Sequence, residues 1–447
     1  MVIGGGVAGL ASAVWLADFG HDVTVVERQD HPGGQLTMPV PTPMTLTLPA
    51  ALRDLFGKTG RRLDREFTLI PADPAVRYVT SRGAVTFPHA SRSGTLAALN
   101  DAFGHETADQ WGRLMRIAGD IWQILRPTFV ERAATPHTIA SLALGTRSRR
   151  TAFATLADVF HRANVTDPTV REIIAAHAYA VGVDPERGPA AVVTRPYLEQ
   201  TFGLWRIDGG PVRLIDALVR RATERGALIS TGVTATHVEL ARRRVVAVHT
   251  DDGARHGADA IVSAVPAAGH HRLLGRGRHP SSQFTISSAR YPAAGLHDLD
   301  APVRTIVTPR NDTPLGTVDV DSDGSTVVHV AVDRSTARHS EEDATTPLHE
   351  LTALVAREPA GTVAELVASG IRPEVYGPQQ WATSLALGNG SPHGPPATGR
   401  WGLARLPRPQ SSIHGLYRAG VAAQPGAGID AAILSAAVIA DLISRPQ

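Results

Sequence analysis

Residues 1–35 decide the fold of this chain, and they read MVIGGGVAGLASAVWLADFGHDVTVVERQDHPGGQ. The glycines Gly4, Gly6 and Gly9 have the spacing GxGxxG, between a short apolar run and a stretch whose apolar residues recur at helical spacing. This order predicts a strand, a tight turn and a helix. A second apolar run then predicts a buried strand that ends at Glu27.

Each part of this pattern has a mechanical role in binding a dinucleotide. The first glycine permits the tight turn, the second lets the backbone approach a pyrophosphate, and the third lets helix and strand pack closely. The helix then presents unpaired N–H groups and its positive dipole end to the phosphates. The carboxylate of Glu27 is placed to accept hydrogen bonds from ribose hydroxyls. A chance glycine turn is the alternative, but the strands, the helix and the acid in register favour a dinucleotide site.

Two features favour FAD over NAD as that dinucleotide. The fingerprint stands at the start of the chain, and a second glycine pair follows the acid in Pro32-Gly33-Gly34-Gln35. In these features the chain resembles the phytoene desaturase and amine oxidase superfamily of flavoproteins, with its patterns GGGxAGL, VxVxE and GGR. The resemblance implies that Gly33 and Gly34 lie near the FAD diphosphate. Gln35 replaces the family's Arg, so a charge-assisted phosphate contact becomes a weaker hydrogen bond.

Two stretches in the middle of the chain resemble the same family. Residues 197–210, YLEQTFGLWRIDGG, are similar to its ExxxGxWxxxGG block. Residues 226–238 are similar to the segment that follows this block, which implies that the backbone of Ala235 contacts the adenine. Residues 258–264, ADAIVSA, match the family's ADxVVxA strand.

The stretch 415–430, GLYRAGVAAQPGAGID, resembles the phytoene desaturase signature LYxxGxxxHPGxGIP. The resemblance implies that its glycines let the backbone lie against the ribityl chain and the flavin ring. It also places the N-terminus of the following helix at the flavin N1–C2=O edge, where the positive dipole end would stabilise reduced flavin. Gln424 replaces the family's His and Asp430 replaces its Pro, although an acid in the first turn of a helix is favourable in itself.

The motif and the resemblance together imply the fold and the cofactor site. We expect an α/β chain in which a Rossmann-like FAD-binding domain of the GR2 flavoprotein type carries an inserted mixed α+β substrate domain. The FAD-binding domain is assigned to 1–65, 197–275 and 405–447, and the substrate-binding domain to 66–196 and 276–404. The residues expected to contact FAD are Gly4, Gly6, Val7, Ala8, Gly9, Glu27, Arg28, Gly33, Gly34, Gln35, Ala235, Ala264, Gly420, Gly428 and Ile429.

Hydrophobic periodicity predicts the elements of the substrate domain. The expected strands are 66–70, 76–80, 84–87, 303–308, 316–320 and 326–332, and the expected helices include 111–125, 170–178 and 347–357. The proline and glycine content of 378–399 predicts a loop that contains Trp381 and His393. We expect His270 and His271 to lie in a solvated loop.

Composition excludes several classes of function. Without cysteine the chain has no disulfide and no thiol chemistry, and its histidines show no HExxH-like metal spacing. The net charge of +2 does not indicate a protein that binds nucleic acid. No apolar run reaches about 18 residues and no basic segment precedes the first strand, so we expect neither a transmembrane helix nor a signal peptide. We therefore expect a cytoplasmic protein. The sequence leaves open whether it contacts the membrane peripherally and which oligomeric state it has. The short first strand leaves room for native residues before Met1.

The resemblance implies an FAD-dependent oxidoreductase of the desaturase or dehydrogenase type, in carotenoid biosynthesis or secondary metabolism. Such an enzyme moves hydride between flavin N5 and a C–C bond of an apolar, polyene or secondary-metabolite substrate, in desaturation or its reverse. The flavin performs this step itself, so the protein needs no nucleophile or metal. The His, Asp and Arg content of the second half of the substrate domain favours a smaller or more polar substrate than a carotenoid.

Two alternatives stay open. The first is a flavin amine oxidase or protoporphyrinogen-type oxidase. The amine oxidase pattern places a lysine next to flavin N5, whereas the one lysine of this chain, Lys58, lies near the N-terminal block. The second is a redox-silent flavin-dependent isomerase, which the replacements at Gln35 and Gln424 would suit.

The candidate catalytic residues at the flavin face are Gln424, Arg206, Trp205 and Trp381. Gln424 would form a hydrogen bond near the substrate or the ring edge. Arg206 would pair with a phosphate or, equally, brace the interface between the domains.

Overall fold

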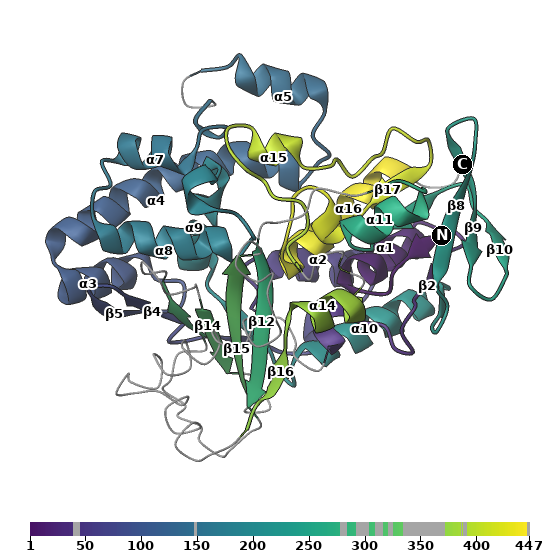
Figure 1. The fold of residues 1–447 in the computed structure, drawn as a ribbon, viewed down its shortest axis with the longest axis horizontal. Helices are drawn as coiled ribbons and strands as arrows, with labels where there is room; N and C mark the ends of the chain where they lie inside the picture. The colour runs from purple at the N-terminus through teal and green to yellow at the C-terminus, as the bar shows by residue number, and fades with distance from the viewer. Residues whose placement is uncertain are drawn as a thin grey trace.

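A computed structural model describes most of the chain. The described residues are 1–38, 45–146, 150–277, 284–291, 304–308, 316–320, 325–333, 372–385, 387 and 391–444. The helix expected at 347–357 lies outside them. In Figure 1 the helices α3, α4, α7 and α8 gather at one end of the molecule, and the strands β8 to β10 form the opposite end.

A five-stranded parallel sheet contains the N-terminal fingerprint. Its order is β17-β11-β1-β2-β7. The strands are β1 (Val2–Ile3), β2 (Thr24–Val26), β7 (Leu228–Ser230), β11 (Ile261–Ser263) and β17 (Leu416–Arg418). Every neighbouring pair is parallel. Strands from the start, middle and end of the described chain therefore form one sheet, as the Rossmann-like fold requires.

Four helices pack around this sheet. They are α1 (Val7–Asp18), α2 (Pro49–Lys58), α10 (Pro211–Glu224) and α16 (Ile429–Ile443). Residues 7–17 of α1 are all buried, because α10 and α16 both pack against this helix. This burial explains why α1 is apolar on every side, since a helix that is hydrophobic all round lies in a core.

A three-stranded antiparallel sheet extends the same region. It consists of β8 (Ala235–Ala241), β9 (Arg244–Thr250) and β10 (Arg255–Gly257), and α11 (Ala267–Leu273) packs against β8. The expectation of a solvated loop at His270 is wrong, because His270 is a buried residue of α11. Its Nδ1 lies 2.9 Å from Ser263 Oγ, and Arg418 Nε donates to its Nε2 at 2.9 Å. These partners come from β11 and β17, so the sequence around His270 does not reveal them.

A seven-stranded sheet dominates the rest of the molecule, in the order β16-β12-β15-β14-β13-β4-β5. Its strands are β4 (Val76–Thr80), β5 (Gly83–Phe87), β12 (Phe284–Tyr291), β13 (Arg304–Val307), β14 (Gly316–Val320), β15 (Thr326–Asp333) and β16 (Glu374–Tyr376). The pair β13 and β4 is parallel, whereas the other pairs are antiparallel. This parallel pair joins segments that lie more than 200 residues apart in the chain.

Helices cover the β4–β5 end of this sheet. They are α3 (Arg92–Phe103), α4 (His105–Leu125), α7 (Leu156–Ala163), α8 (Pro168–Tyr179) and α9 (Thr194–Phe202), and α5 (Pro136–Ala143) lies outside this layer (Figure 1). Buried residues of α4, α7, α8 and the strands β4 and β5 form one hydrophobic core. The expected helices at 111–125 and 170–178 are thus confirmed, with longer N-terminal ends.

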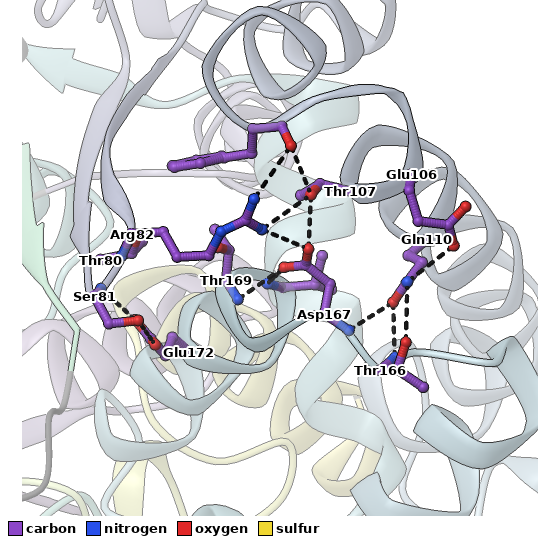
Figure 2. A network of polar contacts seen from close by, with 12 residues as sticks. Thr80, Ser81, Arg82, Glu106, Thr107, Gln110, Thr166, Asp167, Thr169 and Glu172 are labelled. Carbon is purple, nitrogen blue, oxygen red and sulfur yellow. Dashed lines mark hydrogen bonds and ion pairs between the residues drawn. The ribbon is translucent and has the colours of Figure 1, made fainter.

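Asp167 anchors α8 to the sheet (Figure 2). Its Oδ1 accepts hydrogen bonds from the N–H groups of Thr169 and Val170, at 2.8 and 3.3 Å, and so caps the helix. Its Oδ2 accepts hydrogen bonds from Arg82 Nη1 and from Thr107 Oγ1, each at 2.7 Å. Because Arg82 lies in the β4–β5 turn and Thr107 lies in α4, one carboxylate joins the sheet to two helices.

Two local expectations need correction. The strand expected at 66–70 is β3 (Leu69–Pro71), because the N–H groups of Glu66 and Phe67 both bond the carbonyl of Leu63 and continue a turn. β3 pairs with β6 (Trp205–Ile207) in a small separate sheet.

The loop expected at 378–399 begins with a helix, α14 (Pro378–Leu385). Pro378 is the first residue of this helix, where proline is well tolerated because that N–H has no partner inside the helix. The short helix α15 (Gly402–Arg405) follows the loop.

Candidate functional site

A single cavity of about 610 Å³ receives residues from both large sheets. Its volume falls within the range typical of ligand-binding pockets. Ile3 and Val26 of the five-stranded sheet line it, and so do Ile286 and Ala331 of the seven-stranded sheet. All the residues expected to contact FAD line this cavity except Gly9. The structure thus brings together residues that the sequence spreads over more than 400 positions.

Gly9 acts through packing instead. A Cβ atom at Gly9 would lie 1.9 Å from the carbonyl oxygen of Gly4. This is the close approach of helix and strand that the third glycine of the fingerprint allows. Gly4 itself has φ +101°, a conformation that other residues rarely adopt.

The first turn of α1 opens directly onto the cavity. Gly6 is the N-cap residue of α1, and no side chain caps the helix. Gly6, Val7 and Ala8 line the cavity. Backbone N–H groups at a helix N-terminus, together with the positive dipole end, form a site for an anion such as a diphosphate.

Glu27 is held in place at the end of β2. Its side chain is buried, its Oε2 accepts a hydrogen bond from the N–H of Gly5 at 2.6 Å, and its Oε1 accepts one from the N–H of Gln29 at 2.9 Å. Ala235 lines the cavity on the segment that follows Val233, whose N–H bonds the carbonyl of Glu27 at 3.0 Å. The acid expected to bind ribose and the expected adenine contact are therefore neighbours.

A second helix N-terminus meets the same cavity. Gly428 is the N-cap residue of α16, again without a side-chain cap, and it lines the cavity with Ile429. Gly420 lies against α1, because a Cβ atom there would be 3.0 Å from the Cβ atom of Ala8. Two positive helix ends at one cavity suit a ligand with a diphosphate and a second electron-rich group. The residues present therefore fit FAD.

Comparisons with known proteins agree with this geometry. The model of the NAD(P)-binding Rossmann-like domain family matches residues 2–57. Phytoene dehydrogenase of Streptomyces griseus is 30% identical over 289 residues, which are 62% of this chain and 56% of that protein. Hydroxyneurosporene desaturase of Cereibacter sphaeroides is 27% identical over 507 residues, and the match covers 100% of this chain and 98% of that protein. Carotenoid desaturases are thus homologues of this chain, which supports its placement in the phytoene desaturase-like branch of the amine oxidase superfamily.

Solved structures show the same fold. An oxidoreductase from Methanosarcina mazei has a TM-score of 0.65 at 15% identity, over 98% of this chain and 99% of that one. Putrescine oxidase has a TM-score of 0.64 at 16% identity, over 99% of this chain and 98% of that one. The homologues are desaturases, and like them the chain is an FAD-dependent oxidoreductase. Within the described residues, no helix is both long and apolar enough to span a membrane.

Two residues that differ from the phytoene desaturase pattern, Gln35 and Asp430, form hydrogen bonds within the protein. Gln35 lines the cavity, and its Nε2 donates to the carbonyl of Pro392 at 3.4 Å. Asp430, in the first turn of α16, accepts hydrogen bonds at Oδ2 from the N–H and the Oγ1 of Thr47, at 2.9 and 2.8 Å. Its Oδ1 is buried and has no partner among the described residues. Burial raises the pKa of the Asp430 carboxyl.

None of the four candidate catalytic residues lines the cavity. Gln424 is buried, and its Nε2 donates to the carbonyls of Leu403 and Leu406 at 3.2 and 3.3 Å. Its Oε1 is buried and has no partner among the described residues.

The other three candidates lie in elements next to the cavity. Trp205 and Arg206 belong to β6, and Trp205 Nε1 donates to the carbonyl of Phe202 at 2.8 Å. Trp381 is buried in α14, where it packs with Ile286. Of the three, Trp381 packs with a residue that lines the cavity, Ile286.

Sequence reasoning missed four polar residues of the cavity. Arg195 of α9, Arg304 of β13, His329 of β15 and His393 all line the cavity. Burial lowers the pKa of His393 to about 4, with a further contribution from the positive charge of Arg195. His393 is therefore neutral at pH 7. These residues come from separate elements, and no local motif marks them.

Proposed function

We propose that this enzyme moves hydride between FAD and a C–C bond of an apolar, polyene-like substrate. The observation that carries the proposal is the continuity of the cavity, which joins a dinucleotide cradle to an apolar wall. Glycine backbone and two helix N-termini line one part, and Ile286, Ala331 and Leu385 line another. When bound, FAD supplies the hydride chemistry.

The side chains of this chain have three tasks in such a reaction. The apolar wall holds the reacting carbons and excludes water, which strengthens electrostatic interactions in the site. The N-terminus of α16 favours negative charge next to Gly428 and Ile429. Removal of two hydrogens as hydride and proton also requires a proton acceptor. We propose that His393, which is neutral and lines the cavity, accepts the proton on a ring nitrogen. Because its pKa of about 4 makes it a weak base, it passes the proton on and does not hold it.

The position of Lys58 speaks against the amine oxidase alternative. Lys58 lies at the end of α2, its side chain is exposed, and its Nζ bonds Asp54 at 2.7 Å. It does not line the cavity. The isomerase alternative was based on the replacements at Gln35 and Gln424. It is weaker because both side chains form hydrogen bonds to backbone carbonyls of the protein.

We also propose the division into an FAD-binding domain (1–65, 197–275 and 405–447) and a substrate-binding domain (66–196 and 276–404). The five-stranded sheet takes its strands from the first set of segments, and the seven-stranded sheet takes its strands from the second. The pair β3 and β6 links the two sets. The named relatives act on phytoene and hydroxyneurosporene, so we propose a hydrophobic polyene substrate, which the enzyme meets through peripheral membrane contact from the cytoplasm.

The first test is the absorbance spectrum of the purified protein, followed by anaerobic mixing with NADPH and, separately, with a panel of polyenes that includes phytoene. A flavin spectrum that is stable to NADPH and bleached by a polyene, with formation of the dehydrogenated product, is the result expected for a desaturase. Rapid bleaching by NADPH would assign the reductive direction. Absence of flavin from protein that is correctly folded would refute the proposal, and product formation without any flavin change would assign the isomerase.

A further inference from the structure

Arg195 is an unusual residue for a cavity that holds an apolar substrate. It lies in the first turn of α9 and lines the cavity. Among the described residues it forms no hydrogen bond or ion pair, and its Nε atom is buried without an acceptor. Arg195 as a whole is half-buried, and a guanidinium nitrogen that is buried without an acceptor is costly, because it has lost its hydration and gained nothing in return. Such a group is a candidate for contact with a ligand.

Arg304 provides the internal comparison. It lines the same cavity, but its Nε donates to Asp319 Oδ1 at 2.6 Å. Although burial opposes its charge, the Asp319 carboxylate raises the pKa of Arg304. Burial lowers the pKa of Arg195 instead, and no contact reverses that effect. Of the two guanidinium groups, Arg304 has its counter-ion within the protein and Arg195 does not.

Two acids are near enough to Arg195 to affect its charge, but neither contacts it. Glu199 lies one helical turn along α9, and Asp430 begins α16. No ion pair joins either carboxylate to Arg195 in the described structure, and both act on it only through space. Burial raises the pKa of both carboxyl groups, which weakens them as counter-ions.

We propose that the substrate of this enzyme carries a carboxylate at one end of its apolar chain, and that Arg195 binds that carboxylate. The inference rests on the proposed function, because it assigns the substrate of the same cavity. A planar guanidinium group binds a carboxylate through two parallel N–H···O bonds. Among the described residues on the substrate-domain side of the cavity, Arg195 has the one guanidinium group without a counter-ion, whereas Arg28 and Arg272 line the cavity on the side of the FAD-binding segments. One such charge matches a monoanion, and a diphosphate bound there would need more cationic partners. Ile286, Ala331 and Leu385 then line the path of the hydrocarbon.

This assignment also gives the substrate a direction. The carboxylate is fixed on the substrate-domain side of the cavity, at α9, and the dinucleotide cradle lies at α1. A fixed end group sets which carbon atoms reach the flavin ring, since a misplacement of about 1 Å in hydride or proton transfer is costly. A hydrocarbon without an end group could slide along an apolar tunnel, and Arg195 removes that freedom.

Direct binding to the holoenzyme tests the proposal without requiring turnover. The probes are all-trans-retinoic acid and its methyl ester, which share the polyene and differ in the carboxylate, and binding is followed by the change in flavin absorbance. The proteins are wild type, R195Q, R195K and the control R53Q, which removes an exposed arginine on α2. Geranylgeranyl diphosphate is the third probe.

We expect the wild type and R53Q to bind the acid roughly ten- to hundred-fold more tightly than the ester, the range typical of a charged hydrogen bond. R195Q is expected to bind acid and ester equally, and R195K to keep part of the preference. Equal binding of acid and ester by the wild type, or an unchanged preference in R195Q, would overturn the proposal. Tighter binding of the diphosphate than of the acid would overturn the assignment of a monoanion.

The FAD content of each variant is measured in parallel. If R195Q loses FAD and keeps its preference for the acid, Arg195 contacts the cofactor and the proposal fails. If the wild type prefers the acid but shows no redox turnover with any polyene, the proposed function fails and the carboxylate site stands. The two failures are therefore distinguishable.

Discussion

Replacement of Gly6 by alanine separates cofactor binding from folding. Gly6 has φ −76° and ψ −179°, which any residue adopts. A Cβ atom there would meet only the Cα atom of Gly34, at 3.9 Å, so the protein has room for it. The methyl group would instead point into the cavity, at the first turn of α1, where the diphosphate is expected.

The size of the effect follows from these contacts. Replacing glycine by alanine reduces the conformational entropy of the unfolded chain, which stabilises the folded protein by about 0.4–1 kcal/mol. Alanine is a poorer N-cap than glycine by a similar amount, so the stability of the apoprotein should change by less than about 1 kcal/mol. Loss of one charge-assisted hydrogen bond to phosphate costs roughly 1.5–3 kcal/mol, which weakens FAD binding about ten- to hundred-fold.

The assay is titration of stripped apoprotein with FAD, followed by quenching of flavin fluorescence, with thermal unfolding of the apo and FAD-bound forms. The matched control is Gly57→Ala in α2, where an added Cβ atom meets nothing within 4 Å and the cavity is not involved. The control should bind FAD normally. An unchanged Kd for FAD in a folded Gly6→Ala protein would refute the placement of the diphosphate at this turn.

Two further predictions concern stability. Asp167→Ala should lower the free energy of unfolding by about 2–3 kcal/mol at pH 7, because it removes a helix cap and the bonds to Arg82. Burial opposes the charge of Asp167, but its hydrogen bonds lower its pKa overall. The difference from wild type should thus be present above the unfolded pKa and shrink as pH falls below about 4, which denaturant unfolding at several pH values would check. Trp111→Phe should destabilise more than Trp381→Phe, because Trp111 Nε1 donates to Gln200 Oε1 at 2.9 Å, whereas Trp381 Nε1 has no partner among the described residues. Equal urea midpoints for the two variants would contradict this reasoning.

The sequence predicts the cofactor side of the site well because its determinants are local. The spacing of Gly4, Gly6 and Gly9 fixes a turn and a helix start within a few residues, and Glu27 follows after one helix and one strand. Backbone conformation and helix polarity are encoded at this range. The same applies to Gly428, which stands at the start of an apolar helix.

The substrate side could not be predicted in the same way. Arg195 and Arg304 reach one cavity only because β13 pairs with β4 and α9 packs nearby, and neither residue belongs to a recognisable motif. The sequence suggested Trp205 and Trp381 as residues at the flavin face, but neither lines the cavity. For Trp381, the proline at position 378 suggested a loop, although it begins α14. In the sequence, an apolar residue of the core cannot be told from one that lines a cavity. Only the packing of elements that are distant in the chain decides which it is.

The order of strands has a consequence for how the enzyme is made in the cell. The glycine turn leaves the ribosome more than 400 residues before β17 and α16, which complete the sheet and the cavity at 416–443. At translation rates of roughly 5–20 residues per second, the N-terminal unit waits on the order of half a minute for them. During that time α1, apolar on every side, has neither of its helix partners α10 and α16 at first. The nascent chain therefore contains an apolar helix before its partners are made, and the cavity for FAD is complete only once α16 has been synthesised.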